Sequence, residues 1–148
     1  MTRTQRELLD EFMSRADRLV KRIIYTAFAV AEQSYHEQVD PAHVVVVILG
    51  NTTECLHYRR TLREEGYEYN ALVDHINDTY YQWCEGNAPE QLTPDARKMF
   101  ERAIELADGR GLTHKIHPSD LIWVIKEITK NGGNKALTSY KQRLARAS

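Results

Sequence analysis

Three side chains that can bind a metal ion, His114, His117 and Asp120, lie at intervals of three residues in the second half of the chain. Imidazole nitrogens and carboxylate oxygens are common zinc ligands. His117 and Asp120 can share one face of a helix, but His114 precedes that helix, and no fourth ligand is close in sequence. We therefore expect these residues to act in loops and helix caps, with no metal or cofactor bound.

Cys55 and His57 are the nearest approach to a nucleophile and its base. Residues two apart on a helix point in different directions, so this pair cannot form a catalytic dyad within one helix. The sequence also contains no Gly-x-Ser-x-Gly elbow, no His-Glu-x-x-His motif and no Gly-rich phosphate loop. We expect no catalytic residues, and the chain is predicted not to be an enzyme.

The composition excludes several classes of partner. The 148 residues include 20 Lys and Arg against 21 Asp and Glu, a net charge of −1, which gives no overall attraction to nucleic acid or to an anionic membrane. The longest apolar run, 44–49, is too short to span a bilayer, and the first residues lack an apolar signal core. Two cysteines are too few for a disulfide framework. We expect one cytoplasmic domain.

Two groups of side chains are each open to two interpretations. An amino-terminal extension, residues 1–16, begins with the capping-box pattern Thr4-x-x-Glu7 and carries apolar residues that can pack on the same domain or on a second subunit. A cluster of aromatic residues can form a docking surface or cover the edges of the core. Its members are Tyr67, Tyr69, Tyr80, Tyr81 and Trp83.

The elements that position these residues are predicted from a repeat. An Ala-rich segment at 27–31 precedes Val39-Asp-Pro-Ala-His and an apolar run that ends at Leu49. A similar segment at 103–107 precedes Ile116-His-Pro-Ser-Asp and an apolar run to Ile128. The alanine segments are 76 residues apart (103 − 27) and the prolines 77 (118 − 41), so one residue is inserted between the blocks. This spacing indicates two copies of one supersecondary unit.

Both copies show helical periodicity. Apolar residues recur every three or four positions over 20–31 and again over 96–107. The β-branched run 44–49 resembles a buried strand by itself, but its counterpart over 121–128 has helical spacing, so a short buried helix is predicted. The sequence therefore predicts an all-α domain: extension 1–16, first repeat 17–84 with four helices, linker 85–91, and second repeat 92–148 with a third helix at about 134–145.

In order and spacing, these motifs resemble the double Clp N-terminal domain, which lies at the amino terminus of Clp-type AAA+ unfoldases. The resemblance covers roughly residues 17–140 and is carried by the paired blocks at 27–49 and 103–128, by 62–76 and by 92–97. It implies two pseudo-symmetric four-helix Clp repeats, of which the second is truncated here. It also implies a non-catalytic module that binds substrate or adaptor proteins for a Clp unfoldase or protease system.

The chain departs from the family pattern where the second helix of each repeat begins. Family members usually have Glu-His at this point. Here His43 keeps the histidine in the first copy and Asp120 replaces it in the second, while Ala42 and Ser119 occupy the two glutamate positions. Some members read phosphoarginine with those glutamates, so the resemblance does not extend to that specificity. Glu37 does match an acidic position that adaptor-binding members use.

From these residues we predict a partner-binding groove near the starts of the two second helices. The expected partners are Clp unfoldase components, adaptors or unfolded clients, with no nucleic acid and no membrane; the oligomeric state is left open. The chain contains no phosphate loop, although the domain it resembles is followed by an ATPase in Clp unfoldases. An alternative is therefore that the segment is the regulatory N-terminal domain of a longer ATP-dependent Clp unfoldase. The predicted contact residues are Glu37, Asp40, His43, His117, Ser119 and Asp120.

Overall fold

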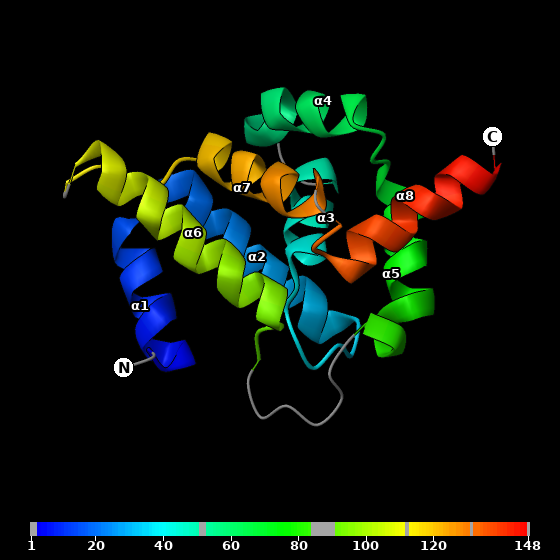
Figure 1. The fold of residues 1–148 in the computed structure, drawn as a ribbon, viewed down its shortest axis with the longest axis horizontal. Helices are drawn as coiled ribbons and strands as arrows, with labels where there is room; N and C mark the ends of the chain where they lie inside the picture. Colours follow the sequence, from blue (N-terminus) through cyan, green and yellow to red (C-terminus); the bar gives the residue numbers. More distant parts are fainter. Residues whose placement is uncertain (1–2, 51–52, 84–90, 112, 131, 148) are drawn as a thin grey trace.

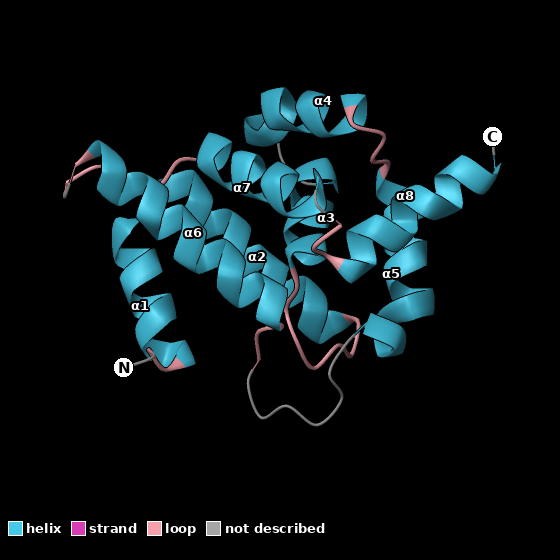
Figure 2. Cartoon of the chain, in the orientation of Figure 1, coloured by secondary structure: helices cyan, strands magenta, loops and turns pink. Residues whose placement is uncertain are grey.

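The computed structural model describes residues 3–50, 53–83, 91–111, 113–130 and 132–147, so Cys84 and most of the predicted linker lie outside the described residues. The described residues form helices joined by loops, with no strand among them, which confirms the all-α prediction (Figure 2). In chain order the helices are α1 (Gln5–Arg15), α2 (Arg18–Gln33), α3 (Pro41–Gly50), the 3-10 turn η1 (Thr53–Cys55), α4 (Leu56–Glu64), α5 (Tyr69–Trp83), α6 (Pro94–Arg110), α7 (Pro118–Lys130) and α8 (Lys135–Ala147).

Helix α3 forms the centre of the fold. All of its residues except Gly50 are buried, and it packs against α2, α4, α5 and α6 (Figure 1). The prediction of a short, buried helix over the β-branched run is therefore confirmed. Burial on every side explains why the local strand propensity of Val44–Leu49 does not decide the structure, since packing outweighs it.

Polar side chains cap the starts of α1 and α6, as the sequence predicts. Thr4 and Glu7 form the predicted capping box on α1, and Thr93 accepts a bond from the Ala96 amide at the start of α6. A third cap, Asp17, was not predicted; its carboxylate accepts a bond from the Val20 amide at 2.8 Å. These caps satisfy amides that have no partner within their own helix.

We expect Asp17→Ala to lower the free energy of unfolding by about 1 kcal/mol, the usual cost of removing an N-cap. Asp17→Asn should cost only a few tenths of a kcal/mol, because asparagine caps helices equally well. Urea unfolding of the two variants measures the difference. Equal losses in both would show that the contact of Asp17 with His117 at 2.8 Å, and not the cap, stabilises this corner.

The amino-terminal extension packs on its own domain. Helix α1 lies along α6, and the rings of Phe12 and Phe100 meet edge to face with centroids 4.6 Å apart (Figure 1). Leu8 and Phe12 are fully buried. Of the two interpretations of residues 1–16, the structure thus shows the intramolecular one.

Two short parallel bridges connect the two halves of the chain. Ala16, which precedes α2, pairs with Ile116, which precedes α7. Val39, which precedes α3, pairs with Leu92, which precedes α6. Leu92 lies 76 residues after Ala16, and Ile116 lies 77 after Val39, so the bridges join equivalent positions with the halves exchanged. The start of each half is therefore fixed to the middle of the other.

The second half contains a third helix, α8, after α6 and α7. Helix α8, Lys135–Ala147, coincides with the predicted third helix and packs against α5 of the first half. Its N-cap is Asn134, whose side-chain oxygen accepts the Leu137 amide at 2.8 Å. The carboxy-terminal helix α8 of the second half therefore covers α5 of the first half.

Candidate functional site

A buried carboxylate, Asp40, connects the starts of three helices. Its two oxygens accept bonds from the Thr93 hydroxyl at 2.7 Å, the Asn134 amide at 2.9 Å and the Ala42 backbone amide at 3.1 Å. Thr93 and Asn134 are themselves the caps of α6 and α8. Burial raises the pKa of Asp40 to about 6, although these hydrogen bonds oppose the shift. We refer to Asp40, His43, Thr93 and Asn134 as the α3-start network.

His43 is buried in the same network. Its Nδ1 accepts the backbone N–H of Asp40 at 3.0 Å, so in the neutral ring Nε2 carries the proton and donates it to Nδ1 of His36 at 2.9 Å. The ring of His36 stacks on Tyr80 with centroids 4.1 Å apart. Burial lowers the pKa of His43 to about 3, with a further lowering from His36. The arrangement therefore favours uncharged His43.

The second half contains the equivalent arrangement at the start of α7. Asp120 occupies the position of His43, and its Oδ2 accepts the backbone N–H of His117 at 2.9 Å. Its Oδ1 accepts a bond from the guanidinium of Arg110. His117 then reaches Asp17 at 2.8 Å, just as Asp40 reaches Thr93 in the first half. We call Asp17, Arg110, His117 and Asp120 the α7-start network.

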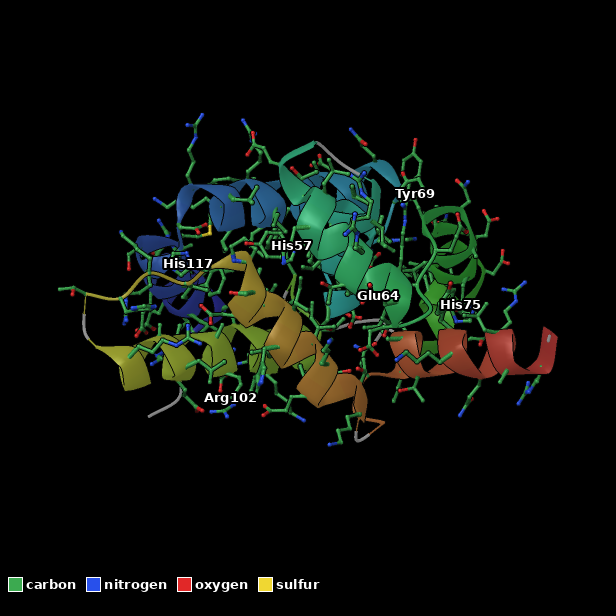
Figure 3. The ribbon with its side chains drawn as sticks, turned by 90° about the horizontal axis from the view of Figure 1, so that it is seen from above. His57, Glu64, Tyr69, His75, Arg102 and His117 are labelled. Carbon is green, nitrogen blue, oxygen red and sulfur yellow. The ribbon has the colours of Figure 1, made fainter. Side chains whose placement is uncertain are left out.

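The structure does not bring the six predicted contact residues into one groove. The α3-start and α7-start networks lie at opposite ends of α6, whose 17 residues extend over about 25 Å. Figure 3 shows His117 at one end of the molecule and Tyr69 and His75 toward the other. Asp40, His43 and Asp120 are each 1% exposed and bond within the domain, so they hold loops in place and do not face a partner. Glu37, His117 and Ser119 are exposed.

Glu37 lies in an open cleft of about 610 Å³ at the carboxyl end of α2, which we call the α2-end cleft. This cleft is larger than the one along α4, about 390 Å³, and the one between α4, α7 and α8, about 330 Å³. Its floor is apolar and its rim carries carboxylates that form no hydrogen bond or ion pair with another described residue. The residues that line it include Phe28, Glu32, Tyr35, Glu37, Val39 and Gln91.

Tyr35 gives this cleft an unusual rim. Its φ is 60°, in the left-handed region that bulky residues seldom adopt, and its side chain is 88% exposed. Such a conformation costs on the order of 1 kcal/mol or more and recurs at functional sites. Because the ring is mostly exposed, packing within the domain offsets little of this cost. Glu32, Tyr35 and Gln91 were not predicted as site residues because no local motif contains them.

The corresponding place at the other end of α6 is occupied by Arg15. Its guanidinium bonds to Asp108 at 2.5 Å, to the Gly111 carbonyl at 3.2 Å and to the His114 carbonyl at 3.1 and 3.3 Å. No local motif marks Arg15, although the repeat offset pairs it with Gln91.

The other candidate sites form no recognisable centre. Tyr67 and Tyr80 are buried whereas Tyr69 and Tyr81 are exposed, so the described tyrosines of the aromatic cluster do not share one surface. Within the described ranges, no three His, Cys, Asp or Glu side chains are placed to hold a metal ion. None of the described helices is both long and apolar enough to cross a membrane.

Comparisons with family models, with curated proteins and with solved structures found no match to this chain.

Proposed function

We propose that this chain is a non-catalytic protein-interaction module of the double Clp N-terminal type. In this role it binds adaptor proteins or unfolded clients for a Clp unfoldase and protease system. The reciprocal pairing of Ala16 with Ile116 and of Val39 with Leu92 carries the proposal. It supports an arrangement of two Clp repeats, the second without its fourth helix.

The use of polar side chains also supports a binding role. The buried polar groups of both networks are bonded to helix starts or to other side chains of the domain, which leaves no free acid, base or nucleophile among them. The exposed members of the predicted set are Glu37, His117 and Ser119, of which His117 also bonds to Asp17 within the domain. We therefore assign direct contact to these three residues.

Affinity capture with the immobilised full chain tests the proposal. From a lysate of the source organism, we expect enrichment of a Clp-type ATPase subunit, its peptidase or a known adaptor, identified by mass spectrometry. The matched variant Glu37→Ala/His117→Ala/Ser119→Ala should capture these proteins several-fold less. All three side chains are exposed, and unfolding curves should confirm that the variant is folded.

Two results would contradict the proposal. One is capture that enriches no Clp component, adaptor or unfolded client above an unrelated helical protein. The other, equal capture of the same Clp component by the triple variant, would contradict only the part of the proposal that assigns direct contact to Glu37, His117 and Ser119.

A further inference from the structure

The repeat offset relates each residue that holds Arg15 to a residue of the α2-end cleft. Asp108, which accepts the guanidinium, corresponds to Glu32 at an offset of 76. His114, whose carbonyl also accepts it, corresponds to Glu37 at an offset of 77. Arg15 itself corresponds to Gln91, at the edge of the same cleft.

The third acceptor of Arg15, the Gly111 carbonyl, corresponds to Tyr35. Both residues follow a helix with positive φ, 133° for Gly111 and 60° for Tyr35. Both amides bond to a carbonyl three residues earlier, at Asp108 and Glu32 respectively. The two loops therefore share this hydrogen bond at their start, although the φ angles of the two residues differ. One site contains a guanidinium, and the other is open because Gln91 has no cationic group.

We propose that the α2-end cleft binds the arginine side chain of a partner polypeptide, in the way the other end binds Arg15. The carboxylates of Glu32 and Glu37 supply acceptors for the planar fork of donors. The carbonyls of Tyr35 and Glu37 are the equivalents of the Gly111 and His114 carbonyls that accept bonds from Arg15. Phe28 and Val39 form an apolar floor for the methylene stem. The exposed ring of Tyr35 offers a face for the cation.

The charge of the rim predicts selectivity. Lysine has three donors on a compact ammonium group and cannot bond to a carboxylate in the two-point manner of arginine, so it should bind more weakly. A phosphorylated arginine brings negative charge beside Glu32 and Glu37 and should be rejected. This inference rests on the proposed function only in taking the partner to be a polypeptide.

The test is an NMR titration of the ¹⁵N-labelled full chain with the synthetic peptide acetyl-Ala-Leu-Arg-Leu-Ala-amide. We expect saturable shifts of the amides of Tyr35 and Glu37. The same peptide with citrulline, the neutral analogue of arginine, should bind at least about tenfold more weakly because the charge-assisted bonds are lost, a factor that corresponds to about 1.4 kcal/mol. The lysine and phosphoarginine peptides should also bind more weakly.

Variants locate the binding. Glu32→Gln/Glu37→Gln should weaken the arginine peptide at least about tenfold, while Glu64→Gln, an exposed glutamate of α4 visible in Figure 3, should leave it unchanged. Gln91→Arg should place an internal guanidinium in the cleft, as Arg15 is placed at the other end. It should block the peptide and raise Tm by about 2–4 °C. Gln91→Ala, which adds no cation, should still bind.

Equal binding of the arginine and citrulline peptides would overturn the inference, and so would an undiminished response of Gln91→Arg. Because the probe is a synthetic peptide, this outcome is separate from capture of Clp components. Loss of arginine selectivity with Clp capture intact would remove only the present inference, and the reverse result would remove only the proposed function.

Discussion

Asp40→Ala is expected to lower the free energy of unfolding by about 3–5 kcal/mol, a large part of the stability of a domain of this size. The side chain is 1% exposed and accepts bonds from Thr93, Asn134 and the Ala42 amide. Its removal leaves the Thr93 hydroxyl and the Ala42 amide buried without this acceptor, whereas the Asn134 amide keeps its bond to Asp95 at 3.1 Å. Each unpaired group costs on the order of 1–3 kcal/mol. The loss is smaller than the sum because water can enter the space left by the carboxylate.

Urea unfolding at pH 7 measures this loss, and two variants serve as controls. Asp74→Ala removes an exposed carboxylate of α5 and should change the free energy of unfolding by less than about 0.5 kcal/mol. Asp40→Asn retains one acceptor oxygen and should fall between the two. If Asp40→Ala costs under about 1 kcal/mol, the three helix starts do not depend on this carboxylate.

Most helices were predictable because their signals are local. The stripe over 20–31, the cap at Thr93 and the capping box at Thr4 each depend on residues within a few positions of one another. The buried helix over 44–49 was predictable only through its counterpart in the second half. Its own β-branched residues would have favoured a strand.

The predicted groove was wrong as a single site because a sequence repeat relates positions without fixing how the two copies are oriented. If the copies were stacked in the same direction, the starts of α3 and α7 could lie side by side. The observed contacts are reciprocal, so the start of each half meets the middle of the other, and α6 separates the two starts by about 25 Å.

The burial of the polar residues at the starts of α3 and α7 could not be predicted from the sequence either. Asp40 is a normal N-cap by type, and nothing near it in sequence indicates its bonds to Thr93 and Asn134, which are 53 and 94 residues away. The α2-end cleft, by contrast, could have been suspected. Aligning the halves at the repeat offset places Glu32 at Asp108 and Gln91 at Arg15. Glu32 therefore lacks the arginine that its equivalent in the second half binds.

His43 and Asp40 should make opposite contributions to stability in acid. The folded-state pKa of His43 is lowered from 6.5 to about 3, so the unfolded chain binds its proton first, and stability is lost as the pH falls below 6.5. The folded-state pKa of Asp40 is raised from 3.8 to about 6, so the folded chain binds its proton first, and stability is gained as the pH falls from 6 toward 3.8. The wild-type profile therefore conceals both effects.

Single variants should separate the two effects. Asn at position 43 can accept the Asp40 amide through Oδ1, as Asp120 does for His117 in the second half, so His43→Asn should remain folded. Between pH 7 and pH 4.5, its destabilisation relative to wild type should shrink by about 2–3 kcal/mol, because wild type alone then bears the cost of protonating His43. Over the same interval, the destabilisation of Asp40→Asn should grow by about 2 kcal/mol, because this variant cannot gain from protonation.

Urea unfolding of wild type and both variants at pH 7.0, 5.5 and 4.5 measures these differences, and groups that interact with neither Asp40 nor His43 largely cancel. Destabilisations that stay constant with pH would show that neither group titrates as its burial requires. Changes of the same sign in both variants would show that the two groups do not titrate independently with opposite effects on stability. Changes of opposite sign would show that folding opposes protonation of His43 and favours protonation of Asp40.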